Sequence, residues 1–149
     1  MYKLDKIDLL LLNQLKQNAR LTNKELAASV NLSPTPVFER IKRLERDGYI
    51  KKYAAILDEE KLNRGFSVFC CVKLSQLNRD IALNFVNTIN DLDYVTECYN
   101  ISGNYDYILK VHTDSMKSYQ EFLMNVLGKI ENLGTVSSMF IMDKIKTDP

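Results

Sequence analysis

The sequence is poor in the residues that build metal sites and disulfide scaffolds: its 149 residues include one histidine, three cysteines and no tryptophan. A single histidine, His112, excludes a histidine-based metal cluster, and Cys70, Cys71 and Cys98 match neither a zinc-site spacing nor a disulfide framework. We therefore expect no metal, and cysteines buried in the strands of a reduced cytoplasmic protein. No apolar run reaches the ~18 residues of a membrane span, so we expect no membrane partner.

Glycine is also scarce, with five residues, and neither a glycine-rich phosphate loop nor a nucleophile elbow occurs. Asp91 and Asp93 are paired carboxylates, but they lack a second chemical group and are typical of a solvated loop. We expect His112 to be a surface or interface residue of a strand, with a pH-sensing role as the alternative. The sequence thus predicts no catalytic residues, no metal ligands and no enzyme activity.

The small net charge of +1 hides two unlike halves of the chain. Residues 1–52 hold 11 Lys and Arg against 6 Asp and Glu, a net charge of +5, whereas residues 53–149 hold 9 against 13, a net charge of −4. Such asymmetry is expected when one part of a chain approaches phosphates and the other does not. The charge pattern is therefore consistent with a nucleic-acid contact in the first part.

Two short helices are predicted in the first part. Asp5 caps the first helix, with Asp8 completing a box-like pair, and Thr22 caps the second, with Glu25 at its third position. Asn31 follows the second helix, where the turn needs a residue that tolerates positive φ.

A basic helix comes next. Ser33 is a favourable N-cap, because its hydroxyl can accept from an amide of the first turn, and Pro34 falls at the first helical position. Gly48 closes the helix. One face is apolar and another is basic at every third residue, as in Val37, Ile41 and Leu44 against Arg40, Arg43 and Arg46.

This succession is the layout of a helix-turn-helix, which favours binding to double-stranded DNA over an ordinary solvated helix. Residues 49–57 are predicted to form a short strand or wing, so residues 1–57 make a winged helix-turn-helix domain. We expect base contacts from Ser33, Thr35, Pro36 and Glu39, and base or phosphate contacts from Arg40 and Arg43. Phosphate contacts are expected from Thr22, Lys24, Arg46, Lys51 and Lys52.

The second part alternates strand and helix patterns in the order β-α-β-β-α-β, a ferredoxin-like unit, so the fold class is α+β. Residues 58–65 are charged and form the linker, and residues 66–145 form the second domain. Its predicted elements are strands 66–75, 94–101, 105–112 and 135–142, with helices 78–90 and from Asp114 or Ser115 to Ile130. Right-handed crossovers place both helices on one face of the sheet. The bare face is then too apolar for solvent, which predicts a symmetric homodimer.

The turn from Ile101 to Tyr107 is the second candidate site. Gly103 and Asn104 suit a hairpin turn by supplying positive φ, but that does not explain Asp106, an acidic residue in an otherwise apolar strand. A carboxylate near free backbone amides can hold the ammonium and carboxylate of an amino acid. A plain hairpin turn remains the alternative.

These motifs resemble the Lrp/AsnC (leucine-responsive, or feast/famine) family of prokaryotic transcriptional regulators over nearly the whole chain. The resemblance rests on Leu4-Asp5 with Asp8, Asn18-Ala19-Arg20, Glu25-Leu26-Ala27, Leu32-Ser33, Val37 with Arg40-Ile41, Arg43-Leu44-Glu45, Gly48-Tyr49-Ile50 and the segment from Ser102 to Lys110. It implies an effector domain that forms dimers through its sheet, dimers that assemble into octamers, and an amino acid as effector. By position, the implied effector contacts are Ser102, Gly103, Asn104, Tyr105, Asp106, Thr135, Val136, Ser137 and Ser138.

Two other classes of function compete with this interpretation. One is a stand-alone amino-acid-binding or enzyme-regulatory module whose first domain binds protein; the salt dependence of DNA binding separates it from a DNA-binding regulator. The other is a ferredoxin-like RNA binder, which the sequence disfavours because it lacks the aromatic RNA-binding strand signature.

Overall fold

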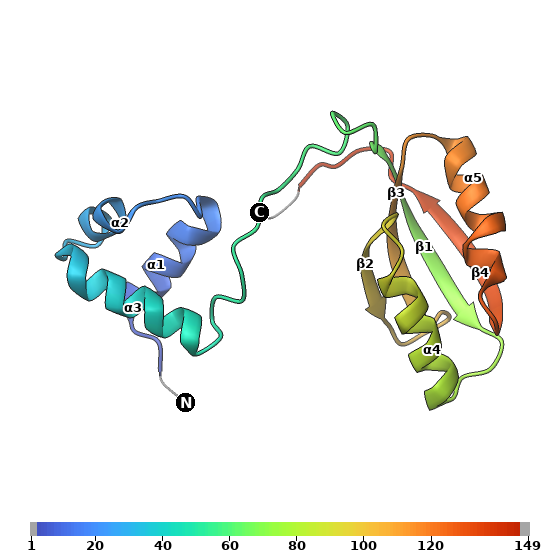
Figure 1. Ribbon diagram of the computed structural model, residues 1–149, viewed down its shortest axis with the longest axis horizontal. Coiled ribbons are helices and arrows are strands. Elements are labelled where there is room, and N and C mark those ends of the chain that lie inside the picture. Colours follow the sequence, from blue (N-terminus) through green and yellow to red (C-terminus); the bar gives the residue numbers. More distant parts are fainter. Residues whose placement is uncertain (1–2, 147–149) are drawn as a thin grey trace. The chain divides into compact units, whose positions relative to one another are not determined.

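The computed structural model describes residues 3–146, which form two compact units, one up to Ile56 and one from Leu57 to Lys146 (Figure 1). The first unit holds the helices α1 (Lys6–Gln17), α2 (Asn23–Ser29) and α3 (Pro34–Arg46). The second holds β1 (Phe66–Leu74), α4 (Arg79–Asn90), β2 (Val95–Asn100), β3 (Tyr107–Thr113), α5 (Met116–Asn125), the 3₁₀ turn η1 (Leu127–Lys129) and β4 (Leu133–Phe140). No helix in these described residues is long and apolar enough to cross a membrane.

The helix starts of the first unit follow the predicted capping chemistry in two cases of three. Asp5 and Asp8 form a reciprocal capping box on α1, and Thr22 and Glu25 form another on α2. Ser33 is the N-cap of α3, with Pro34 directly after it, but the Ser33 hydroxyl makes no capping hydrogen bond. The expected hydroxyl bond is therefore wrong; proline at the first position removes one amide donor from the turn.

Two residues with positive φ follow the two helices of the helix-turn-helix. Asn31 has φ 54° in the turn between α2 and α3, and Gly48 has φ 78° after α3, both as predicted. Their turns bring the apolar faces of the three helices together around a small core of Leu11, Leu15, Leu26, Ala27, Val37 and Ile41.

The predicted strand at residues 49–57 is absent from the described chain. Tyr49 and Ile50 both donate their backbone N–H to the carbonyl of Leu44, which folds the chain back over the end of α3. Residues 51–57 then run without regular secondary structure. A strand needs a neighbouring strand for its ladder of hydrogen bonds, and the unit that contains this segment is otherwise helical.

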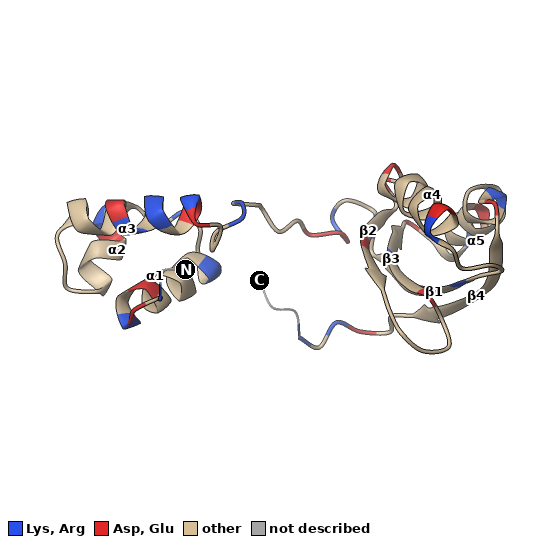
Figure 2. Cartoon of the chain, turned by 90° about the horizontal axis from the view of Figure 1, so that it is seen from below, with Lys and Arg blue, Asp and Glu red and all other residues tan. Residues whose placement is uncertain are grey.

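The second unit has the predicted β-α-β-β-α-β order. Its sheet is antiparallel throughout, in the order β2-β3-β1-β4, and both α4 and α5 lie on one side of it (Figure 2). Asn78 and Ser115 cap the two helices with their side chains. The single helix predicted to reach Ile130 is wrong: α5 ends at Asn125 and the chain continues as the 3₁₀ turn η1.

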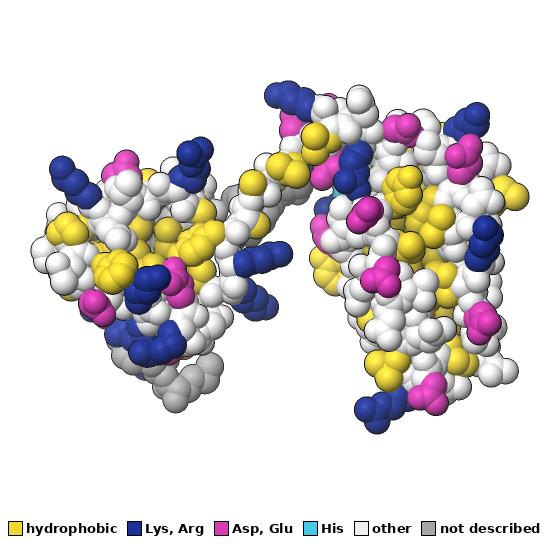
Figure 3. All heavy atoms as spheres, in the orientation of Figure 1, with side chains coloured by type: hydrophobic (Ala, Val, Ile, Leu, Met, Phe, Trp, Pro, Cys, Tyr) yellow, Lys and Arg dark blue, Asp and Glu magenta, His cyan; other side chains and the backbone are white. Residues whose placement is uncertain are grey.

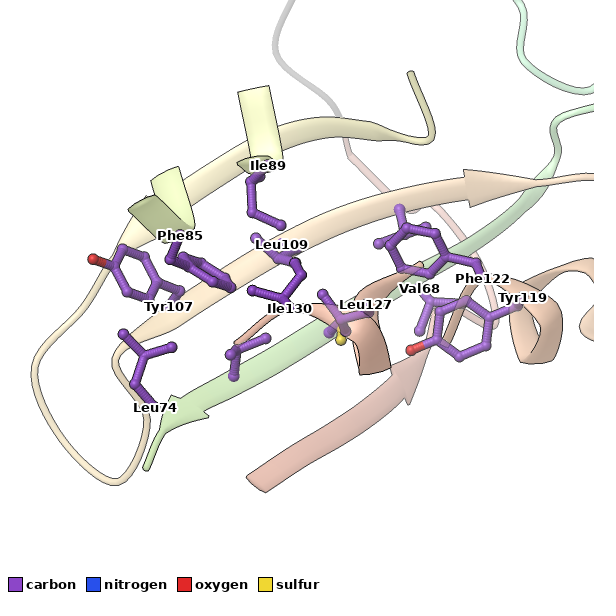
Figure 4. Close-up of a cluster of buried hydrophobic side chains, with 13 residues drawn as sticks. Val68, Leu74, Phe85, Ile89, Tyr107, Leu109, Tyr119, Phe122, Leu127 and Ile130 are labelled. Atoms are coloured by element: carbon purple, nitrogen blue, oxygen red, sulfur yellow. The ribbon is translucent and has the colours of Figure 1, made fainter. Parts of the chain in front are cut away.

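The two faces of this sheet differ. Toward the helices, Val68, Cys70 and Val72 of β1 pack with aromatic and aliphatic side chains from both helices and from β3 (Figure 4). The other face, which we call the open face, carries the alternate residues of each strand. The strand register groups them as Phe69, Cys71 and Lys73 of β1, Ile108, Lys110 and His112 of β3, Thr135, Ser137 and Met139 of β4, and Glu97 and Tyr99 of β2.

Candidate nucleic-acid interface and ligand site

The helix α3 presents three faces with different surroundings. Its inner face is apolar as predicted, because Val37, Ile41 and Leu44 are buried, the first two in the core that α1 and α2 share. The flank toward the start of α1 carries Arg40 and Arg43, and the face away from the core carries the exposed residues. Only this last face is open to a large partner.

Arg40 and Arg43 do not point outward as predicted. The Arg40 Nη1 atom lies 2.6 Å from the Asp5 Oδ2 atom and 2.7 Å from the Asp8 Oδ1 atom, and the Arg43 Nη2 atom lies 2.9 Å from the same Asp8 oxygen. Both guanidinium groups are thus held by carboxylates of the neighbouring helix. The prediction of an outer row of three arginines is wrong, because an arginine on a helix flank turns toward a buried acid within reach.

The burial of Asp8 explains this pairing. Its side chain is 0% exposed, and a buried carboxylate is unfavourable unless cations and donors surround it. The backbone N–H of Asp8 and then the Arg40 guanidinium lower the pKa of Asp5. In return, hydrogen bonds to Asp5 and Asp8 raise the pKa of Arg40. The four side chains therefore join α1 to α3.

The exposed face of α3 is formed by different residues. Thr35, Phe38, Glu39, Lys42 and Arg46 are all exposed and recur at helical spacing on one side. Sequence reasoning missed Phe38 and Lys42. The sequence does contain a feature that could have identified them, because Phe38 is a large apolar residue outside the buried stripe and Lys42 follows it by one turn. We call this set of five residues the outer face of α3.

A chain of contacts ties the extended segment to α3. The Lys42 Nζ atom lies 5.7 Å from the Phe38 ring centroid and 3.0 Å from the Glu45 Oε2 atom. The Tyr53 hydroxyl donates to the Glu45 Oε1 atom at 2.9 Å. Hydrogen bonds from Lys42 and then Tyr53 lower the pKa of Glu45, while burial and then Glu45 raise the pKa of Tyr53 to about 12. Tyr53 thus anchors the residues that follow Lys51 and Lys52.

The remaining predicted DNA contacts are open to solvent in this unit. Arg46 is exposed and pairs with the adjacent Asp47, at 2.9 Å between Nε and Oδ1. The others are exposed at the starts of α2 and α3 and after α3: Thr22, Lys24, Ser33, Pro36, Lys51 and Lys52.

The turn at residues 102–106 is held against β1. The Asp106 Oδ2 atom accepts from the Leu74 N–H at 2.8 Å, and the Asp106 N–H donates to the Val72 carbonyl at 2.9 Å. Asp106 lies just before β3 and not within the strand predicted for it, and its carboxylate accepts from a backbone amide of β1. Gly103 has φ 136°, but Asn104 does not have the positive φ predicted for it.

The four residues proposed on β4 lie on two faces of the sheet. Val136 packs on the core and the Ser138 hydroxyl lies 2.6 Å from the Tyr119 hydroxyl, so both face the helices. Thr135 and Ser137 alternate with them and lie on the open face. A strand cannot direct four consecutive side chains to one ligand on one face.

Lys73 joins the turn to the open-face residues of β4. Its Nζ atom donates to the Asn104 carbonyl at 3.2 Å, and its position in β1 lies opposite Thr135 in β4. No role was predicted for Lys73 from the sequence. The sequence feature that could have identified Lys73 is a cation at an outward position of an otherwise apolar strand.

Sequence comparison places two known domains on this chain. Residues 4–51 match a winged helix-turn-helix DNA-binding domain, and residues 67–149 match the Lrp/AsnC ligand binding domain. The chain is 34% identical to the leucine-responsive regulatory protein of Escherichia coli over 143 residues, which cover 96% of this chain and 87% of that protein.

Solved structures of transcriptional regulators are also similar to this chain. A transcriptional regulator from Neisseria meningitidis in complex with L-Met has a TM-score of 0.94 at 32% identity, covering 98% of this chain and 94% of that one. An AsnC family transcriptional regulator from Agrobacterium tumefaciens has a TM-score of 0.92 at 32% identity, covering 97% of this chain and 94% of that one.

Proposed function

Because this chain belongs to the Lrp/AsnC family of DNA-binding transcriptional regulators, we propose that it holds duplex DNA with the outer face of α3 and answers to an amino acid bound beside the turn at residues 102–106. The outer face of α3 is the observation that supports this most. It is the exposed side of a recognition helix, and the cations Lys51 and Lys52 follow that helix on an anchored segment. The chain then acts by binding, and we assign it no catalytic role.

The DNA contacts divide into base and phosphate contacts. We place base contacts on the outer face of α3, at its N-terminal half, and phosphate contacts at Thr22, Lys24, Arg46, Lys51 and Lys52. Arg40 and Arg43 support the fold instead, because their guanidinium groups are already bound to Asp5 and Asp8.

Salt-dependent binding tests this division. Replacing Lys51 and Lys52 together by Gln is expected to weaken binding to a random-sequence fluorescent duplex and to lower the salt slope by about 2, since each lysine contact contributes about 1. Lys117 and Lys129, exposed in the other unit, give a control pair with the same loss of charge. Equal changes in both pairs would contradict the assignment, and a wild-type chain that binds no duplex would overturn the function.

For the effector, we propose a site at the end of the open face formed by the turn at residues 102–106 with Lys73, Thr135 and Ser137. Lys73 supplies a cation for the carboxylate of an amino acid, while the turn carbonyls and the second Asp106 oxygen supply acceptors for its ammonium. The L-Met complex of the Neisseria meningitidis regulator supports this ligand class. No other cofactor is proposed.

Thermal-shift measurements with the twenty amino acids test the site. A ligand that binds only the native state at ~100 times its Kd stabilises by about 2.7 kcal/mol. We expect Lys73→Gln to lose this shift and Lys117→Gln, an exposed control on α5, to keep it. A full shift in Lys73→Gln would remove Lys73 from the site, and no shift with any amino acid in the wild type would refute the ligand class.

The open face supports a homodimer as the basic assembly. Phe69, Cys71 and Ile108 form its apolar centre, and Met139 and Tyr99 beside them are about half exposed. We propose that two copies cover this face in a cytoplasmic dimer, and that dimers assemble further into octamers. In sedimentation, Met139→Lys is expected to give monomers, while Met124→Lys on the exposed side of α5 keeps the dimer; the reverse result would place the interface on the helices.

A further inference from the structure

Two neighbouring residues on the outer face of α3 are not explained by their contacts within the described chain. Phe38 is 41% exposed, although a phenyl ring gains most from burial. Glu39 makes no hydrogen bond and no ion pair anywhere in residues 3–146, although it belongs to a helix with four cationic side chains. An exposed ring and an unpaired carboxylate side by side indicate that their partner lies outside the chain.

The Phe38 ring is held in place rather than free to fold back. Lys42 covers it from the next turn, and Lys42 is itself bound to Glu45, which the Tyr53 hydroxyl holds from the other side. On this unit hydrophobic side chains come to the surface among Lys and Arg side chains (Figure 3). A fixed apolar edge of this kind fits the C5-methyl group of thymine, the one apolar group in the major groove.

Glu39 further restricts which chemical group of a partner can lie against the outer face of α3. The cations that could have neutralised it on the flank of α3, Arg40 and Arg43, are bound to Asp5 and Asp8. An unpaired carboxylate near DNA phosphates is repelled unless a base-edge donor offsets the repulsion. In the major groove the donor that suits a carboxylate is the exocyclic amine of cytosine.

We propose that Phe38 and Glu39 determine the operator sequence that this chain selects, Phe38 through a thymine methyl group and Glu39 through the N4 amine of a cytosine nearby. This inference rests on the proposed DNA-binding surface, since it assigns base chemistry to two residues of that surface. Adjacent residues on one helix face reach neighbouring base pairs, so the thymine and the cytosine lie within one half-site.

Selection from randomised duplexes with the full chain tests Glu39. Glu39→Gln is expected to change one selected position from cytosine to adenine, because a glutamine amide pairs with the adenine N6 and N7 atoms. The preference at that position should change by roughly 10- to 100-fold. Glu121→Gln, an exposed control on α5 with the same change of charge, should select the wild-type sequence. An unchanged sequence preference in Glu39→Gln would overturn the assignment.

Replacing single thymines of the selected operator by uracil tests Phe38, because it removes only a methyl group from the DNA. One such replacement should weaken wild-type binding about 4-fold, the effect of one buried carbon. Phe38→Ala should bind both duplexes equally while keeping its melting temperature. A wild-type chain that is indifferent to every replacement would refute the role of Phe38 whether or not the variant folds.

A wrong DNA-binding surface and a wrong base assignment give different experimental results. If the DNA-binding surface is assigned wrongly, substitutions at Lys51 and Lys52 leave the salt dependence of binding unchanged. If only the base assignment is wrong, that dependence falls as expected, but Glu39→Gln and Phe38→Ala select the wild-type operator.

Discussion

Arg40 distinguishes a structural arginine from a DNA-binding one. We predict that Arg40→Ala weakens DNA binding by destabilising the first unit, and not by removing a contact to DNA. Its guanidinium group binds Asp5 and Asp8 at 2.6 and 2.7 Å, and Asp8 is fully buried. Without Arg40, Asp8 keeps only Arg43 among the cations that the structure places on it.

The magnitude follows from the burial of Asp8. Breaking a buried ion pair by removing one partner costs about 3–5 kcal/mol, and the remaining Arg43 favours the lower end, ~3 kcal/mol. A unit of about 55 residues has only about 3–8 kcal/mol of total stability at the usual value per residue. Arg40→Ala should therefore remove from about a third to all of the stability of the first unit.

The assay combines urea unfolding, followed by circular dichroism, with DNA binding measured at the same temperature. Arg46→Ala is the control, because Arg46 lies on the outer face of α3 with a side chain that is 73% exposed. It should lose DNA affinity with little change in the unfolding midpoint. If Arg40→Ala kept the wild-type midpoint and still lost binding, Arg40 would be a DNA contact and its structural role would be refuted.

Three further predictions concern stability. Thr22→Ala should destabilise the first unit by about 1 kcal/mol and Ser33→Ala by much less, because only the Thr22 hydroxyl accepts a capping bond; equal losses in urea unfolding would be inconsistent with this. Burial lowers the pKa of His112 below the ordinary histidine value of about 6.5. The unfolded chain therefore binds the proton more readily, and the second unit loses stability as pH falls below about 6.5. His112→Gln should remove this dependence in thermal melts, and an unchanged profile would exclude His112 as its source. Tyr119→Phe should cost about 1 kcal/mol through the lost bond to Ser138, and a neutral result would show that this buried hydroxyl adds no net stability.

Much of the architecture could be predicted because its signals are local. The capping residues Asp5 and Thr22, the positive-φ residues Asn31 and Gly48, and the buried stripe of α3 each act within one or two helical turns. The alternation along β1 likewise determines which side chains face the helices. Such local interactions can be predicted from the sequence alone. They were sufficient to predict the helix-turn-helix and the β-α-β-β-α-β order.

The misjudged residues are those whose partners lie far away in the sequence. Arg40 binds Asp5 and Asp8 more than thirty positions earlier, and Asp106 binds the Leu74 amide of another strand. The strand predicted at residues 49–57 is absent for the same reason, because a strand exists only with a neighbouring strand. Hydrophobic periodicity shows that a residue lies outside the apolar stripe of a helix. It does not show whether the side chain is exposed to solvent or bound to a buried charge.

By itself, the sequence determined that a basic helix-turn-helix precedes an acidic α+β domain, since charge, capping and hydrophobic period are properties of short segments. Only the tertiary structure decided which residues of α3 face outward. Packing against α1 turned Arg40 and Arg43 toward Asp8 and left Phe38, Glu39 and Lys42 exposed, because a buried carboxylate takes the cations within its reach.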